Sequence, residues 1–451
     1  MRIGPPELPG GALAESPIDR ALALSLSGER DAALRWAAAV VQADPQMPSG
    51  LLMCGRLLAE ANRLEGAREA LELCLQESIE SGNLPLAVAA CSDLRQTAVD
   101  PTPMYRAIAD AFCAGAARAD AANVAPPQLP GTDAVHPLPS VLTGMALLSR
   151  TAEIIRGARK NRKDRLDARS EPPRLAPLPL FSDFSCPALL ALVQVFEVRT
   201  VPNGAVIIDE GEEGAEAYIL ARGELEARKS VKDADPIVLS RLTAGALFGE
   251  MALLSRAPRA ASVVACRPSV ILVARKDALD AVATEFPEIG TRFAEYCRNR
   301  MVQNLVHTNA ILKAVAPEER SGLIDSFVTR TFEPGDTLIR QNETSAGLFL
   351  IASGAVQVVR EEAGERLVLS TLGPGGIAGE VSLVLRKPST ARVIAAHPTL
   401  ALHLPRESFL SIIRKHPAVL YELYTLAVAR DEETNTIVGQ EALDVDDTVL
   451  V

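Results

Sequence analysis

The chain has 451 residues, of which 48% are hydrophobic, and this length predicts two or three globular domains. Its formal net charge of −11 makes it a poor general binder of nucleic acid. No apolar run approaches the roughly 18 residues of a membrane span and no signal peptide is evident, so we expect a cytoplasmic protein. The seven cysteines form no CxxC pair and the five histidines have no ligand spacing, so we expect buried free thiols and no metal site.

Residues 17–122 are rich in alanine and leucine and show helical periodicity. Ala33 and Ala67 lie 34 positions apart, and Gly55 falls at a second small position of the same pattern. Small residues recurring at this period, where helices cross closely, resemble tetratricopeptide repeats, here two to three units. The aromatic signature is thin, since Trp36 is the only tryptophan, and a plain helical bundle remains the alternative.

Residues 123–174 are expected to form a linker, which begins as a Pro-rich segment and then holds one helix over about 141–160. The basic run Arg159–Arg169 follows this helix. It is interpreted either as a solvated helix end or as a docking or inhibitory segment.

From about residue 175 the chain repeats itself on a longer period. Gly204 matches Gly335 at an offset of 131 residues, and Glu250 matches Glu380 at an offset of 130. Short β-branched runs punctuated by glycine predict a small β-barrel or jelly roll in each copy, with flanking helices. The expected fold class is multidomain α + β. Its parts are a helical repeat region over 17–122, the linker over 123–174, β-roll domains over 175–306 and 307–430, and an acidic disordered tail over 431–451.

One loop of the first copy has residues suited to holding a cyclic phosphate. It reads Phe248-Gly249-Glu250-Met251-Ala252-Leu253, then Ser255-Arg256-Ala257-Pro258-Arg259-Ala260-Ala261 after one further leucine. A buried phosphate charge needs a cationic partner, and the guanidinium of Arg259 supplies fixed donors that keep their charge. Gly249 lets the backbone approach closely, and the N–H groups of Ala252 and Leu253 would point at the phosphate. Because its carboxylate would repel a phosphate, Glu250 is expected to accept a hydrogen bond from a ribose 2′-hydroxyl.

This loop resembles the phosphate-binding cassette of the cyclic-nucleotide-binding domains in regulatory subunits of cAMP-dependent protein kinase. With both copies, the resemblance covers over half of the chain. It implies the same roles for Glu250 and Arg259, a cyclic-nucleotide ligand, and no further cofactor. Ala260 stands where cGMP-preferring members often have threonine, so cAMP is expected, with cGMP as the alternative. The expected first site comprises Gly249, Glu250, Met251, Ala252, Leu253, Arg259, Ala260 and Ala261.

The second copy departs from this pattern. Its arginine position is Ser389, and Ser345 stands where the first copy has Gly214. Serine cannot offset a buried phosphate charge, so the site is expected to be silent or weak toward cyclic nucleotides. A ligand without the phosphate, such as a nucleoside, is the alternative. The candidate residues of this second site are Gly379, Glu380, Ser382, Ser389 and Thr390.

The output of such a sensor depends on the segments outside the two β-rolls. No helix-turn-helix segment follows the second copy and no catalytic motif is present, so we expect neither DNA binding nor catalysis. The main hypothesis is a cAMP-responsive adaptor that binds a protein partner through its helical repeats. A regulatory subunit that inhibits a kinase is the second, although Arg165–Ser170 matches a kinase-inhibiting segment poorly, and a constitutive scaffold with vestigial sites is the third. Phe286, Phe293 and Tyr296, on helices after the first barrel, either cover the base or belong to the core.

Overall fold

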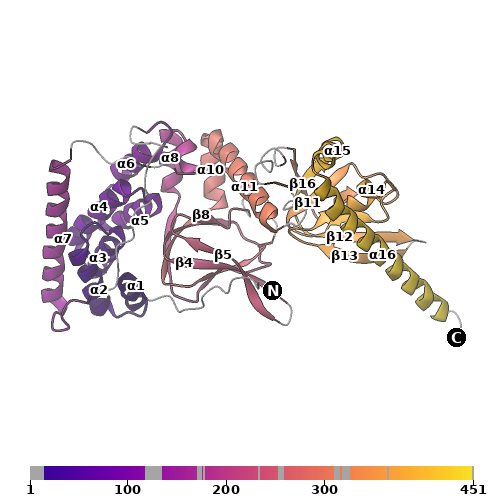
Figure 1. Ribbon diagram of the computed structural model, residues 1–451. Coiled ribbons are helices and arrows are strands. Elements are labelled where there is room, and N and C mark those ends of the chain that lie inside the picture. Colours follow the sequence, from indigo (N-terminus) through magenta and orange to yellow (C-terminus); the bar gives the residue numbers. More distant parts are fainter. Residues whose placement is uncertain are drawn as a thin grey trace, which may run out of the picture.

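The structure is a computed structural model of an elongated chain with three parts: a helical region, a first β-roll and a second β-roll (Figure 1). It describes residues 15–116, 135–169, 175, 178–231, 234–251, 258–308, 315–316, 323, 326–362 and 365–448. This arrangement confirms the predicted multidomain α + β fold class. None of the helices in these ranges combines the length and the apolar character that a bilayer-spanning helix needs.

Six short helices build the N-terminal region, and each packs against its neighbour in the chain. Small residues allow their close approach: Ala33 and Ala67 are fully buried, and a Cβ added to Gly55 would lie 2.6 Å from Cγ of Leu71. The predicted helical region is therefore confirmed, whereas its assignment as tetratricopeptide repeats stays a prediction. The helices are α1 (Pro17–Leu26), α2 (Arg30–Ala43), α3 (Pro48–Glu60), α4 (Leu64–Glu80), α5 (Leu84–Leu94) and α6 (Thr102–Phe112), with a 3₁₀ turn at Arg95–Thr97.

A seventh helix, α7 (Gly144–Asp167), packs along α2 and α4 and carries most of the basic run. Arg162 pairs with Glu80 at 2.5 Å, and Arg165 pairs with Glu77 at 2.5 Å. Both guanidinium groups are largely buried by these contacts. The run lies at the C-terminal end of α7 and most of its residues are exposed, as the interpretation of a solvated helix end expects, but Arg162 and Arg165 are held by the acidic face of α4.

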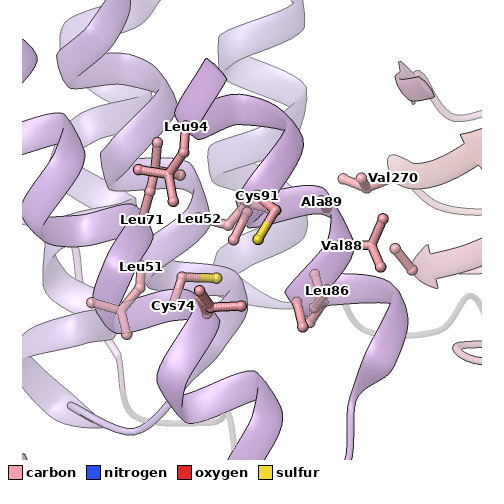
Figure 2. Close-up of a cluster of buried hydrophobic side chains, with 14 of the residues drawn as sticks. Leu51, Leu52, Leu71, Cys74, Leu86, Val88, Ala89, Cys91, Leu94 and Val270 are labelled. Atoms are coloured by element: carbon pink, nitrogen blue, oxygen red, sulfur yellow. The ribbon is translucent and has the colours of Figure 1, made fainter. Parts of the chain in front are cut away.

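The helical region shares one continuous hydrophobic core with the first β-roll. Helix α5 contacts strands β1 (Glu197–Val201) and β3 (Glu216–Arg222). In Figure 2, Val88 and Ala89 of α5 lie opposite Val270 of the β-roll. Because their core residues form a single cluster, the two parts are expected to move as one body.

Two of the seven cysteines form a disulfide, which contradicts the expectation of free thiols throughout. Cys113 and Cys186 are bonded across 73 residues of sequence, with Cα atoms 5.0 Å apart. The pair joins the end of α6 to the start of α8 (Cys186–Gln194). Sequence spacing could not reveal this pair, because folding alone brings the two segments together. The remaining cysteines are free: Cys54, Cys74, Cys91 and Cys297 are buried and Cys266 is partly exposed.

Each β-roll consists of two antiparallel four-stranded sheets. In the first roll the strand orders are β1-β8-β3-β6 and β2-β7-β4-β5; in the second they are β14-β11-β16-β9 and β10-β15-β12-β13. Alternating apolar residues from both sheets fill each interior. The other strands of the first roll are β2 (Val206–Ile208), β4 (Glu224–Val231), β5 (Ala234–Thr243), β6 (Leu247–Phe248), β7 (Ser262–Ala265) and β8 (Ser269–Arg275). Those of the second are β9 (Val328–Phe332), β10 (Thr337–Ile339), β11 (Gly347–Ser353), β12 (Val356–Glu362), β13 (Glu365–Leu372), β14 (Ile377–Ala378), β15 (Arg392–Ala395) and β16 (Thr399–Pro405).

Helices follow each roll and connect the parts. Helices α10 (Lys276–Glu285) and α11 (Pro287–Thr308) come after the first roll, while α15 (Arg406–Lys415) and α16 (Pro417–Thr448) come after the second. A short helix, α14 (Glu380–Val384), lies against α16. Of the flanking helices predicted for the second copy, the one before its strands, over about 309–326, lies mostly outside the described residues.

The C-terminal segment is helical through Thr448, so the predicted disordered tail over 431–451 is wrong for 431–448 (Figure 1). Leu423 and Ala427 are fully buried, which anchors α16 on the second roll. Asp431 then pairs with Lys387 at 2.5 Å. Extending an existing helix by one residue is much less unfavourable than nucleating a new helix. The acidic composition of this segment therefore does not prevent α16 from continuing through it. Residues 449–451 lie outside the described residues.

Candidate functional site

Arg259 is held in place by main-chain groups of two neighbouring segments. Its backbone N–H donates to the carbonyl of Glu212 at 2.8 Å, and its carbonyl accepts from the N–H of Gly211 at 2.9 Å. Its guanidinium donates to the carbonyl of Gly249 at 2.7 Å and to that of Glu216 at 2.9 Å. Within the described residues, Arg259 forms no ion pair with a carboxylate. Its guanidinium is therefore fixed in place by main-chain groups, and its positive charge can pair with an anionic ligand.

Two glycines make room for this arginine. A Cβ added to Gly214 would lie 2.4 Å from Nη2 of Arg259, closer than any real contact. Gly249 has a φ of +71°, in the left-handed region, and a Cβ there would lie 3.0 Å from both Nη1 of Arg259 and Cδ2 of Tyr218. The stacked rings of Tyr218 and Phe248, 5.1 Å apart, lie on the same strand pair. The geometry therefore depends on glycine at both positions.

Glu250 is buried and connects the loop to helix α11. Its side chain pairs with Arg300 of α11 at 3.6 Å, and Arg300 also donates to the carbonyl of Leu247. Burial raises the pKa of the Glu250 carboxyl, and the guanidinium of Arg300 acts against this rise. Sequence reasoning missed Arg300. The internal repeat could have identified Arg300. Arg430 is its equivalent 130 positions later, and Arg430 pairs with Glu380 at 2.6 Å.

The first roll has a pocket of about 680 Å³ whose lining includes Gly214, Glu216, Tyr218 and Arg259. Burial lowers the pKa of the Arg259 guanidinium, and nearby acidic groups raise it again, so it stays charged at neutral pH. Burial also raises the pKa of Tyr218 to about 12, and its hydroxyl donates to Glu216 at 2.7 Å. The other charged residues of the lining are Arg199, Arg275, Glu212, Glu213 and Asp277, and Glu250 does not line this pocket. The fixed cation of Arg259 is the feature that suits an anionic ligand.

Most of the predicted first-site residues can be placed. Gly249, Glu250 and Arg259 come together in the first roll, as described above. Ala260 is exposed beside Arg259 and Ala261 is partly buried. Met251 instead packs against the core of the second roll. Ala252 and Leu253 lie outside the described residues.

Three aromatic residues were left open as base cap or core. Phe286, Phe293 and Tyr296 pack against the large core shared by the helical region and the first roll. All three are partly buried, and this placement favours the core interpretation. None of the three lines the pocket that contains Arg259.

The second roll brings all five of its predicted residues around one pocket of about 240 Å³. The loop pairing of the first roll is retained: the N–H of Asn342 donates to the carbonyl of Ser389 at 2.8 Å, and the N–H of Ser389 donates to that of Glu343 at 2.9 Å. Ser389 thus occupies the place of Arg259, and Glu380 occupies that of Glu250. The residues around the pocket are Gly379, Glu380, Ser382, Ser389 and Thr390.

Comparison with known proteins identifies both rolls. The cyclic nucleotide-binding domain family matches residues 198–285 and 329–416. A cAMP-dependent protein kinase regulatory subunit of Yarrowia lipolytica is 30% identical over 235 residues, covering 51% of this chain and 57% of that protein. The cGMP-dependent protein kinase 2 of Homo sapiens is 29% identical over 221 residues, covering 48% of this chain and 27% of that protein. Among solved structures, the regulatory domain of Toxoplasma gondii protein kinase A, crystallised with cAMP, is 23% identical, with a TM-score of 0.28; the match covers 54% of this chain and 89% of that one.

The two family matches span the β-rolls and helices α10 and α15, and both follow the N-terminal helical region in the chain. The chain spans about half the length of the regulatory subunits it matches. The two family matches agree with the two rolls and with the internal repeat. The chain therefore contains two tandem cyclic nucleotide-binding domains, homologous to those of the regulatory subunits of cAMP-dependent protein kinases.

Proposed function

We propose that this chain is a non-enzymatic cyclic-nucleotide sensor, in which cAMP binds beside Arg259 and alters the binding of a protein partner. The observation that carries this proposal is the guanidinium of Arg259, which two main-chain carbonyls hold in a pocket of the first roll. A cyclic phosphate placed there gains a fixed cation without any ordering of that side chain. We assign the ribose 2′-hydroxyl to the carboxylate of Glu250, which directly follows Gly249 in the same loop.

The preference for cAMP over cGMP rests on one residue. Ala260, next to Arg259, has no hydroxyl to offer the amino group of guanine. Relatives of both kinds occur, since the matched proteins include cAMP-dependent and cGMP-dependent kinases by name. We therefore assign cAMP as the main ligand and cGMP as its competitor.

Titration calorimetry of the full chain with cAMP and cGMP tests this assignment. Arg259→Ala would leave a buried phosphate without its main partner, a loss of roughly 3–5 kcal/mol or at least about a hundredfold in affinity. Arg241→Ala is the matched control, because Arg241 is an exposed arginine of the same roll that pairs with Glu224 and Glu226. Equal cAMP affinity in the wild type and in Arg259→Ala would overturn the assignment.

We propose that the helical region carries the response to a protein partner. Support comes from the core that it shares with the first roll, because a change in that roll reaches α5 through direct contacts. The alternative, a regulatory subunit that inhibits a kinase, is supported by the homology to such subunits. It is weakened by Arg162 and Arg165, which are paired with Glu80 and Glu77 and are not free to occupy a kinase.

A pull-down with the full chain, with and without cAMP, distinguishes these outputs. A protein that binds in only one of the two conditions and is not a kinase supports the adaptor. A kinase catalytic chain released by cAMP supports the inhibitory subunit. A set of partners that cAMP leaves unchanged supports a constitutive scaffold and contradicts both.

A further inference from the structure

The pocket of the second roll is lined by hydroxyl groups and lacks the free cation of the first. Its charged lining residues are Glu380, Glu433 and Arg430. Arg430 is engaged, since it donates to the carbonyl of Ile377 at 2.5 Å and pairs with Glu380 at 2.6 Å. Among the described residues around this pocket, the remaining charge is therefore negative. The hydroxyl groups belong to Ser370, Ser382, Ser389, Thr390 and Thr434.

In the second roll, another side chain occupies the position that corresponds to the Arg259 guanidinium of the first roll. In the first roll, Arg259 donates to the carbonyl of Glu216 at 2.9 Å. In the second roll the equivalent carbonyl, 131 positions later, is that of Gly347, and the hydroxyl of Ser345 donates to it at 2.6 Å. A small hydroxyl thus takes over one of the hydrogen bonds that the arginine makes.

Ser345 also excludes an arginine sterically. It stands at the position of Gly214, where any Cβ would lie 2.4 Å from the guanidinium. It is buried, and its own N–H donates to the hydroxyl of Ser382 at 3.1 Å. The two replacements, glycine by Ser345 and arginine by Ser389, therefore compensate each other and form a site of their own.

One hydroxyl in this site lacks a partner. Ser389 lines the pocket and is 6% exposed, and its buried Oγ has no hydrogen-bond partner within the described part of the chain. A buried polar group without a partner is costly, so native structures usually satisfy it. A ligand with a hydrogen-bonding group at this point would supply the missing bond.

We propose that the second roll binds an uncharged ribonucleoside and rejects cyclic nucleotides. A cyclic phosphate that entered this pocket would lose its hydration and would contact Ser389 where the first roll has a cation. Glu380 and Glu433 lie nearby, so no positive charge among the described residues offsets the free energy of desolvating the phosphate. A nucleoside carries no such charge. Its vicinal ribose hydroxyls suit Glu380, which is 2% exposed and keeps acceptor capacity beyond its bond to Arg430. This ligand differs from that of the first roll, so the two rolls of one chain would bind two different ligands.

The first test isolates the second site in the full chain. Arg259→Ala silences the first roll, and this variant is titrated with adenosine, guanosine and cAMP. We expect one of the nucleosides to bind, with cAMP at least about a hundredfold weaker. Adding Ser389→Ala should weaken the nucleoside by about three- to tenfold, the effect of one hydrogen bond. Absence of binding by both nucleosides, or cAMP binding as tightly as they do, would overturn the proposal.

The second test converts the site. Ser345→Gly combined with Ser389→Arg, in the Arg259→Ala background, restores both the cation and its space. This variant should gain cAMP affinity by about a hundredfold, while Ser389→Arg alone should not, because Ser345 blocks the guanidinium. Thermal unfolding shows whether each variant is folded. A folded double variant without this gain contradicts the proposed role of the two serines, whatever the wild-type chain does with cAMP at the first site.

Discussion

At the scale of single residues, Gly214 and Arg259 act as a pair. The motif around Arg259 marks the cation, but the space for that cation is set 45 positions earlier in the chain. Gly214 has no unusual φ, so its role is not one of backbone conformation. It lies under the guanidinium, where a side chain of any size would displace the arginine.

We therefore predict that Gly214→Ala weakens cAMP binding nearly as much as Arg259→Ala, by about a hundredfold. The added methyl would lie 2.4 Å from Nη2, and the flexible end of the arginine would move rather than the backbone. The thermal unfolding temperature should consequently stay unchanged. Calorimetry and thermal unfolding check both statements, with Gly157→Ala as control because a Cβ there meets nothing within 4 Å. Wild-type affinity in Gly214→Ala would show that the arginine does not need this space.

Some site residues could be read from the sequence and others could not. Glu250 and Arg259 lie nine positions apart in one motif, so local spacing identifies them. Arg300 lies 50 positions after Glu250, and only the packing of α11 on the loop brings the two together. The repeat offered the clue, since Arg430 and Glu380 form the same pair in the second roll. Comparing the copies position by position would have exposed this pair.

At the scale of elements, a buried ion cluster ties helix α1 to the first roll. Asp19 is 2% exposed and pairs with Arg222 and with Arg267, the latter at 2.9 Å. Asp19 also caps α1, since its carboxylate accepts from the N–H of Ser16 at 3.1 Å. One carboxylate thus serves both the start of the helix and its docking onto the roll.

Asp19→Ala is expected to destabilise the helical region and the first roll by roughly 3–5 kcal/mol. It would remove the cap and the carboxylate that pairs with the buried guanidinium of Arg222, while Arg267 would retain Glu224 at 3.4 Å. Denaturant unfolding measures the change. Glu295→Ala serves as control, because the Arg292–Glu295 pair is exposed and such pairs contribute about 0–1 kcal/mol. Equal unfolding free energies for the two variants would mean that the cluster does not hold the parts together.

The elements that were predicted wrongly share one cause. Composition alone described the acidic C-terminal segment as disordered, yet it is helical through Thr448. Composition also could not show that Arg162 and Arg165 of the basic run pair with acids distant in sequence. Arg165 meets Glu77 across 88 positions, and Asp431 meets Lys387 across 44. The Cys113–Cys186 bond spans 73 positions. Periodicity and motif spacing report local order, whereas these contacts exist only after the helices have packed.

At the scale of the whole molecule, Met251 connects the first site to the second roll. Met251, directly after Glu250, packs against the core of the second roll. Arg298 of α11 also donates to the carbonyl of Phe327 at 3.3 Å, immediately before that roll's first strand. A ligand shifts a population only when it interacts differently with the two arrangements. A movement of the loop would change the Met251 contact, so this residue offers the direct route between the sites.

We predict that Met251→Ala uncouples the second roll from cAMP while the affinity of the first site changes little. Cyclic AMP should alter amide exchange in β11 and β16 of the wild type, because the loop that contacts the phosphate also contacts that core. In Met251→Ala this response should disappear, and the response around Arg259 should remain. Exchange mass spectrometry with and without cAMP measures both, and Met145→Ala, an exposed methionine on α7, is the control. If the second roll responds to cAMP equally in both variants, coupling runs through α11 instead, and the bond from Arg298 to Phe327 becomes the element to break.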